Sequence, residues 1–361
     1  MLRVANSRQP GPGANHVALR ASNERLVLSL IRAHGQLSKA QIAELTGLTA
    51  QTASVISRSL VEAGLLVEGA AVRGKVGQPS VPLSLNPDGA MFLGVHIGHG
   101  ELRAALVNFT GGVVAERAST ISSPSTDRVA RFIRDAANRM RIGEDPRQRA
   151  RFQGIGVSIA SSSLTQIQAN IPWQDLETSL DTLGQTFGVA TYVSSDALAA
   201  CSAELIYGLG TGVADFLYVF IDNSISGGLV QEGRIRFSRD ETGANVGKVL
   251  VPSVDGRTVP LRSLAHPLLR KPTAKSVDLV AHGIAIALTA ANSLLPCRTV
   301  ILDGAISRDL LQQITVRLRA ALAQLDVPEA SELSVREGSR ERKNVALGAA
   351  CLPLADRFYP S

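Results

Sequence analysis

The sequence has few cysteines and no long apolar run. Its three cysteines, Cys201, Cys297 and Cys351, lie too far apart for a zinc knuckle and make a poor disulfide framework. No stretch of ~18 residues is free of polar interruptions, and the N-terminus MLRVANSRQPGPGANH lacks the apolar core of a secretory signal. Since 45% of the residues are hydrophobic and 19% are charged, the chain is not disordered. We expect a soluble cytoplasmic protein of two or three domains.

Positive charge is concentrated near the N-terminus. The chain has 37 Lys and Arg against 31 Asp and Glu, a net charge of +6. Residues 1–86 hold nine basic and four acidic residues, or +5, so the other 275 residues contribute 28 minus 27, or +1. This asymmetry favours a nucleic-acid-binding module on a nearly neutral body, although a solvated basic tail has the same composition.

The first 86 residues predict an arm followed by a winged helix-turn-helix. Residues 1–21 are rich in Pro, Gly, Asn and Arg and predict a flexible basic arm. A helix is expected from Asn23 to about Gly35, a short second helix after the cap Ser38, and a third from the cap Thr49 to Glu62. Two apolar runs around the basic tip RGKVGQP form the wing. The DNA-binding domain and its linker therefore span residues 22–86, and the proline-rich stretch 79–89 is expected to be stiff.

Residues 87–361 have the alternation of an α/β body. Three short strands are expected within MFLGVHIGHGELRAALVNFTGGVVAERA, followed by a helix at 129–140 and the strand FQGIGVSIA. A second alternation contains helices at 176–187, 197–207 and 277–295 and the strands FLYVFI and TVILDG, before a last helix at 344–354. Sheets followed by helices, repeated twice, predict two related lobes with a cleft between them.

The polar N-terminal face of the third helix is the predicted base-reading surface. A helix fits the width of the major groove, where its first turns meet base edges. Gln51 can pair with adenine, Arg58 suits a phosphate or a guanine, and the start of the second helix favours a phosphate. A bundle of this shape also suits a protein-binding module, and Thr49 by itself is better explained as a helix cap. The candidate DNA contacts are Ser38, Lys39, Thr49, Gln51, Thr52, Ser54, Arg58, Arg73, Lys75 and Gln78.

The order and spacing of several motifs resemble regulators of the ROK family (repressors, open reading frames and sugar kinases). These motifs include AQIAELTGLTAQTASVISRSLVEAGLLVE, GKVGQPSVPLSLNPDG, FLGVHIG, YVSSDALAACSAELIYG, SGGLVQEG, TVILDGAIS and NVALGAACLPL. The resemblance runs from about Gly13 to the C-terminus. It implies two actin-like, ribonuclease-H-type α/β lobes behind the winged helix-turn-helix, assembled as a homodimer or tetramer.

Both phosphate-binding turns depart from the pattern of the ROK kinases that the chain resembles. The first turn begins with His96 where the kinases have an Asp, so the metal-binding carboxylate is absent. The second, Asp222-Asn223-Ser224-Ile225-Ser226, replaces a glycine-rich turn and brings a negative charge toward a polyphosphate, a repulsion of ~1 to 4 kcal/mol. We therefore expect no kinase activity and no bound cofactor.

The resemblance also implies where an effector binds. Asp196 matches the catalytic base of the kinases, and regulators keep it as a sugar contact, although capping of the next helix explains it equally well. The family's zinc ligands are replaced, with Lys248 at the histidine position and no cysteine cluster, so no metal is expected. The exchange of acidic for neutral or basic groups favours a sugar acid or sugar phosphate, unless the pocket is vestigial. The candidate effector contacts are Asn170, Ser195, Asp196, Asn245 and Lys248.

These observations favour a sequence-specific transcriptional regulator that binds double-stranded DNA. A repressor of carbohydrate transport or catabolism genes, controlled by a sugar-derived effector, agrees best with the family resemblance. One alternative is a ROK-type sugar kinase with an appended DNA-binding domain. Another is a DNA-binding protein whose kinase-like body serves only for assembly.

Overall fold

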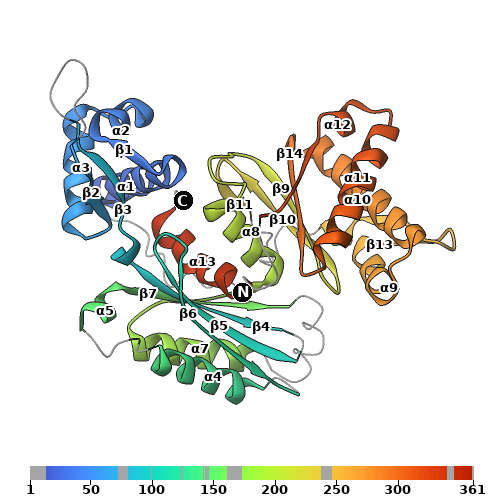
Figure 1. Cartoon of the computed structure of the whole chain (residues 1–361), viewed down its shortest axis with the longest axis horizontal. Coiled ribbons are helices and arrows are strands. Elements are labelled where there is room, and N and C mark those ends of the chain that lie inside the picture. Colours follow the sequence, from blue (N-terminus) through green and yellow to red (C-terminus); the bar gives the residue numbers. More distant parts are fainter. Residues whose placement is uncertain are drawn as a thin grey trace.

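The structure is a computed structural model that describes residues 14–71, 80–98, 100–122, 125–140, 142, 146–160, 173–236, 246–339 and 345–359. A small N-terminal head is joined to two α/β lobes, here called lobe 1 and lobe 2 (Figure 1). The predicted fold class, a winged helix-turn-helix followed by two actin-like lobes, is confirmed by this arrangement.

The head contains three helices and a small sheet. The helices are α1 (Ala14–His34), α2 (Lys39–Thr46) and α3 (Ala50–Glu62). The strands β1 (Gln36–Ser38), β2 (Leu66–Glu68) and β3 (Pro82–Leu85) form an antiparallel sheet with the order β1-β3-β2. The predicted second and third helices and the two wing strands are confirmed. β1 was not predicted.

The first helix starts earlier than the sequence suggested. Helix α1 begins at Ala14, so residues 14–21 of the predicted arm are helical and the expected start at Asn23 was wrong. Contacts across the helix and to α3 explain the extension, because Arg20 pairs with Glu24 at 3.0 Å and donates to the Ser59 hydroxyl at 2.9 Å. Part of the predicted linker also belongs to the head, since Pro82–Leu85 is strand β3.

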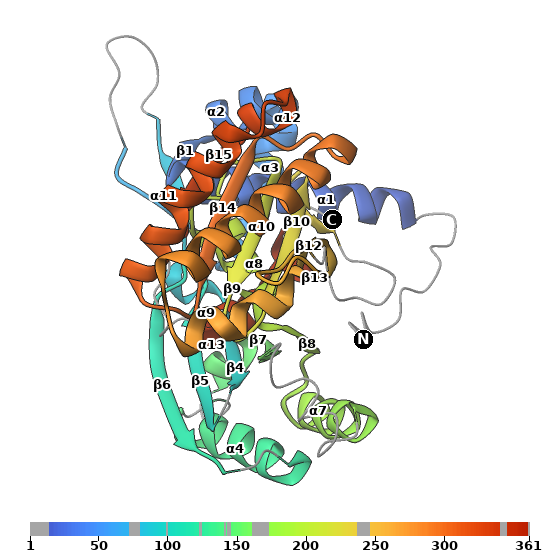
Figure 2. The ribbon, with the colours of Figure 1, turned by 90° about the vertical axis from the view of Figure 1, so that its right-hand side faces the viewer.

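Lobe 1 is built on a mixed five-stranded sheet with the order β6-β5-β4-β7-β8. Two helices cover one of its faces (Figure 2). A 3-10 turn, Pro87–Gly89, connects β3 of the head directly to the first strand of this sheet. The elements of lobe 1 are β4 (Met91–Ile97), β5 (Glu101–Asn108), β6 (Val113–Thr120), α4 (Thr126–Arg139), α5 (Pro146–Arg151), β7 (Phe152–Ile159), α7 (Trp173–Phe187) and β8 (Thr191–Ser195).

Lobe 2 repeats this plan with a sheet of the order β11-β10-β9-β14-β15. The strands are β9 (Phe216–Ile221), β10 (Ile225–Gln231), β11 (Arg234–Arg236), β14 (Thr299–Gly304) and β15 (Ser334–Glu337). The helices are α9 (Ala265–Arg270), α10 (Ala274–Leu294), α11 (Arg308–Gln324) and α12 (Pro328–Ser331). A separate hairpin, β12 (Leu250–Pro252) with β13 (Thr258–Pro260), follows the 3-10 turn Val246–Lys248.

Two helices lie between the lobes and pack on each other, α8 (Asp196–Tyr207) and α13 (Val345–Phe358) (Figure 1). Helix α13 lies directly on the backbone of the lobe 1 sheet. A side chain at Gly94 would collide with the carbonyl of Ala346, and one at Gly156 with the carbonyl of Ala349. Glycine at these two strand positions therefore permits the close approach.

One described helix, α10, is long and apolar enough to cross a membrane. Half of its apolar window is buried within the protein, and Val280, Ile284 and Leu288 belong to the core of lobe 2. Because a core helix of a globular protein has the same length and composition, this is weak evidence for a membrane span. The three cysteines are buried at 0–2% exposure, and the sequence-based interpretation of Cys201 and Cys297 as core or near-core thiols is confirmed.

Candidate nucleic-acid interface and effector cleft

Local hydrogen bonds fix the helix-turn-helix. The Ser38 hydroxyl accepts from the Gln41 N–H at 3.3 Å, and the Gln41 side chain accepts from the Ser38 N–H at 2.9 Å, which together form a capping box at the start of α2. Gly47 ends α2 with a φ of 69°, a conformation that favours glycine. The Thr49 hydroxyl accepts from the Thr52 N–H at 3.2 Å and caps α3. Ser38 and Thr49 thus have a structural role whether or not they touch DNA.

Helix α3 has one buried face and one exposed face. Ala53, Ile56, Ser57 and Leu60 are buried in the head. Gln51, Val55 and Arg58 are exposed and lie at positions i, i+4 and i+7, so they share the outer face, while Thr52 and Ser54 are half-buried beside it. Sequence reasoning missed Val55, whose side chain is 54% exposed and suits an apolar contact with a thymine methyl group. The helical spacing from Gln51 would have indicated it.

The other predicted DNA contacts have different surroundings. Lys39, at the start of α2, lies 3.4 Å from the Glu68 carboxylate of β2, so the wing partly neutralises its charge. Arg73, Lys75 and Gln78 lie outside the described residues. The described strands β2 and β3 flank them and form the base of the wing.

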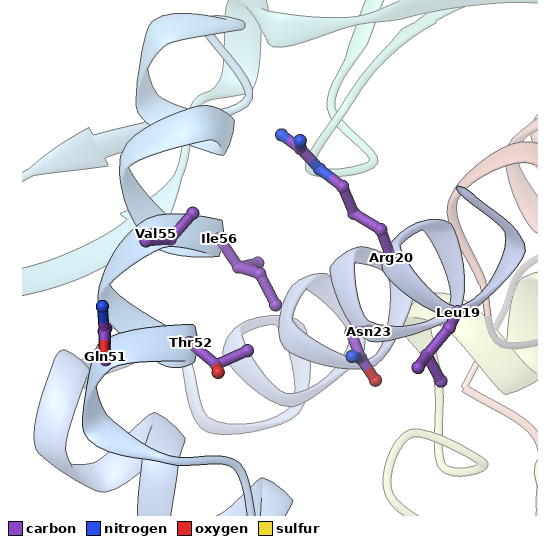
Figure 3. Close-up of a pocket in the computed structure, with 7 residues that line it drawn as sticks. All are labelled: Leu19, Arg20, Asn23, Gln51, Thr52, Val55 and Ile56. Carbon is purple, nitrogen blue, oxygen red and sulfur yellow. The ribbon is translucent and has the colours of Figure 1, made fainter. Parts of the chain in front are cut away.

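A groove of about 330 Å³ runs between α1 and the recognition helix α3 (Figure 3). Leu19, Arg20 and Asn23 line it from α1, and Gln51, Thr52, Val55 and Ile56 line it from α3. Sequence reasoning missed this surface because it placed residues 19 and 20 in an arm. The start of α1 therefore lies beside the predicted base-reading face and adds Arg20 and Asn23 to the surface around Gln51.

The predicted effector residues are only partly brought together. Ser195 caps α8 by accepting from the Leu198 N–H at 3.3 Å, and Asp196 follows as the first helical residue, 2% exposed. One Asp196 oxygen accepts from the Ala197 N–H at 2.8 Å. The cap that had been considered for Asp196 is thus supplied by Ser195. Lys248 lies on lobe 2 and is exposed, while Asn170 and Asn245 lie outside the described residues.

A row of polar side chains crosses lobe 1 beside this helix end. His96, Ser158 and Ser194 occupy paired positions on the parallel strands β4, β7 and β8, near their carboxyl ends. The His96 Nδ1 and Ser158 Oγ atoms are 3.0 Å apart, and the buried Ser194 Oγ has no hydrogen-bond partner among the described residues. Sequence reasoning missed both serines, since only the strand register aligns them with His96.

Burial lowers the pKa of His96 to about 4, against a partial opposing effect of Glu101. The imidazole is therefore neutral at pH 7 and provides hydrogen-bonding capacity rather than positive charge. His99, three residues further along the same strand region, lies outside the described residues. Among the side chains that the structure describes, no three His, Cys, Asp or Glu residues gather as a metal site would require.

The predicted second phosphate turn is the tip of a hairpin. Strands β9 and β10 are joined by Asp222-Asn223-Ser224, and the Asp222 N–H donates to the Ser224 carbonyl at 3.0 Å. This backbone bond closes the turn on itself, so the Asp222 N–H is already engaged. The tip differs from an open glycine-rich loop whose N–H groups surround a phosphate.

Family models match two parts of the chain. A model of winged helix-turn-helix DNA-binding domains matches residues 20–67, and the ROK family model matches residues 92–258. Among solved structures, a ROK family transcriptional regulator described as a homologue of the Escherichia coli Mlc protein aligns with a TM-score of 0.71 at 18% identity, covering 94% of this chain and 98% of that one. A ROK family glucokinase from Streptomyces griseus aligns with 73% of this chain and 99% of its own at a TM-score of 0.54 and 18% identity. These likenesses show the shared fold.

Curated relatives with similar sequences are named as repressors and regulators. A putative xylose repressor of Caldicellulosiruptor is 25% identical over 60% of this chain and 55% of its own length. The DNA-binding transcriptional repressor Mlc of Escherichia coli is 24% identical over 67% and 60%, and the dual regulator NagC of the same organism is 23% identical over 65% and 59%. The chain thus spans somewhat more than half the length of these relatives. Residues 92–258 of the chain thus match the ROK family, and residues 20–67 ahead of them match winged helix-turn-helix DNA-binding domains.

Proposed function

We propose that this protein is a sequence-specific transcriptional regulator that represses carbohydrate transport or catabolism genes in the cytoplasm. The observation that carries the proposal is the outer face of α3, where Gln51, Val55 and Arg58 are exposed on a capped helix of an intact helix-turn-helix. The names of the relatives, which include xylose and N-acetylglucosamine repressors, agree with a sugar-controlled regulator.

The proposed DNA contacts are divided by role. Gln51, Val55 and Ser54 face the bases from α3, and Arg58 contacts a phosphate or a guanine. Ser38, Lys39, Thr49 and Thr52 lie at the two helix starts, where N–H groups favour phosphates. The wing residues Arg73, Lys75 and Gln78 complete the set. In a homodimer two recognition helices would bind half-sites about one helical turn, or ~34–36 Å, apart.

The effector would bind between the lobes at the start of α8. Asp196 is buried there, and Ser194 offers a hydroxyl that has no partner among the described residues. Asn170, Ser195, Asn245 and Lys248 are the remaining proposed contacts, and Lys248 favours a sugar acid or sugar phosphate. An effector shifts DNA affinity only if the protein has one arrangement of the lobes that binds DNA and another that does not, and the effector binds these two arrangements with different affinities.

A sugar kinase is the second candidate, and the buried Asp196 in the position of the kinases' catalytic base is the observation that favours it. His96 in place of the metal-binding Asp, and the closed hairpin tip at Asp222, argue against it. We propose that the protein does not transfer phosphate.

Selection of duplexes from a random library by the full-length protein tests the proposal. We expect a defined, two-fold symmetric site, whose binding a sugar or sugar acid weakens in an electrophoretic shift titration. The same panel of sugars is incubated with ATP and Mg²⁺ to measure phosphorylation. Recovery of no preferred duplex would refute the regulator, and ATP-dependent sugar phosphorylation would establish the kinase.

A further inference from the structure

Helix α1 belongs to the head but has a second face that contacts the lobes. Val27 and Ile31 are fully buried on one side, in the core of the head. Arg25, Ser29 and Arg32, at positions i, i+4 and i+7, lie on the opposite side. The three are directed to the body: burial and Asp356 raise the pKa of Tyr192 in lobe 1, and the charge of Arg25 lies near enough to oppose this rise in small part, while Ser29 lies beside the Tyr359 hydroxyl, just after α13.

Arg32 makes the closest of these contacts. One of its terminal nitrogens, Nη1, donates to the Phe109 carbonyl in the β5–β6 turn at 2.9 Å. The guanidinium carbon lies 4.9 Å from the ring centre of Phe109 and 5.1 Å from that of Tyr207, the last residue of α8. Both distances are within the range of cation–π attraction, which is stronger for a partly buried cation. The other nitrogen, Nη2, is buried without a hydrogen-bond partner among the described residues, so the rings are its main surroundings.

This contact is a second attachment of the head, separate from the chain connection. The connection itself is held by the Phe109 N–H, which donates to the Pro87 carbonyl at 3.0 Å. A head attached to the body only at the connection between β3 and β4 could rotate about the peptide chain. Arg32 adds a contact from a different element of the head, α1, which meets the same Phe109 and also Tyr207 of α8. Tyr207 and Tyr359 are themselves joined to the body, since their hydroxyls donate to the carbonyls of Phe109 and Leu205. Two attachments, one at the β3–β4 connection and one on α1, define the orientation of the head on the body, whereas a single attachment does not.

We propose that Arg32 is a positioning residue that fixes the orientation of the DNA-reading head on the lobes. Arg32 acts through α1, whose other face packs against α2, α3 and β3. The position of α1 on the lobes therefore sets the direction in which the outer face of α3 points. The claim that this orientation matters for DNA binding rests on the proposed function. The claim that Arg32 fixes the orientation of the head on the lobes does not.

The position of this contact also gives it a regulatory role. Tyr207 ends the same helix that Asp196 begins, and the 12 residues of α8 span about 18 Å as one rigid element. The proposed effector site and the seat of Arg32 are thus the two ends of α8. A displacement of α8 at the cleft reaches α1 through Tyr207 without passing through the β3–β4 connection.

Distance measurements between spin labels test the positioning role in the full-length chain. Labels are placed at Glu44→Cys on α2 and Arg134→Cys on α4, both exposed, and the three native cysteines are buried and stay unlabelled. Dilution with excess unlabelled protein isolates distances within one chain. We expect a narrow distribution by double electron–electron resonance in the parent, and one at least twice as wide in Arg32→Ala. Arg32→Lys, which keeps the charge over the rings but loses the planar fork, is expected to lie between them.

Arg20→Ala is the matched control, because Arg20 lies on the same helix but bonds only Glu24 and Ser59 of the head among the contacts described. It should leave the distribution narrow. Tyr207→Leu removes one of the two rings that Arg32 contacts on the body, and it should broaden the distance distribution as Arg32→Ala does. This second variant keeps the test valid if Arg32→Ala does not fold. An unchanged width in Arg32→Ala or in Tyr207→Leu, or equal broadening by Arg20→Ala, would overturn the proposal. A broadened Arg32→Ala in a protein that selects no duplex would preserve the positioning role and refute the proposed function.

Discussion

Arg58 provides the sharpest test of the proposed DNA interface. Its side chain is exposed on the outer face of α3 and forms no ion pair with any described residue, so its charge is available to DNA. A phosphate contact contributes about 0.9 to the slope of log affinity against log salt concentration. In a dimer, Arg58→Ala removes two such contacts and should reduce the slope by about 1.8. Between about 50 and about 200 mM salt, the parent should therefore lose about 12-fold more affinity than the variant.

The measurement is a fluorescence anisotropy titration of the selected duplex at several salt concentrations. Arg128→Ala is the control, since Arg128 is also exposed but lies on α4 of lobe 1, away from the head. The control should leave the slope unchanged. A slope in Arg58→Ala equal to that of the parent would refute the phosphate role, and a loss of preference for one base pair would assign Arg58 to a guanine instead.

Three further predictions concern stability, measured as the free energy of unfolding in urea. Thr49→Ala removes the cap of α3 and should cost about 1 kcal/mol, whereas Thr49→Ser should cost much less; equal losses would contradict the capping role. Gly94→Ala inserts a Cβ against the Ala346 carbonyl and should cost about 1 to 3 kcal/mol, and an unchanged midpoint would contradict the close packing of α13. Because the pKa of His96 is lowered to about 4, the unfolded chain binds the extra proton. The stability of the protein should therefore fall as the pH drops from about 6.5 towards 4, by about 2 kcal/mol at pH 5, and His96→Gln should remove this dependence.

Features encoded by neighbouring residues could be predicted from the sequence. Ser38, Gly47 and Thr49 mark the helix-turn-helix because caps and tight turns depend on residues only a few positions apart. The two lobes followed from alternating apolar patterns, and the outer face of α3 followed from its caps. None of these required knowledge of tertiary contacts.

Features that depend on distant residues could not be predicted. Strand β1 forms because Leu37 pairs with Leu83 of β3, and three residues carry too little pattern by themselves. The start of α1 was missed because it is stabilised by Ser59 of α3. The alignment of His96 with Ser158 and Ser194 depends on the register of three strands far apart in the chain. Tertiary pairing decided each of these.

The direct contact of α13 with glycines of the lobe 1 sheet limits how the molecule can move. With no side chain between Gly94 and Ala346 or between Gly156 and Ala349, there is no layer of rotamers that could rearrange and let the helix slide. Helix α13 and lobe 1 must then travel together. Any opening of the cleft is therefore a displacement of lobe 2 against a single unit made of lobe 1 and α13.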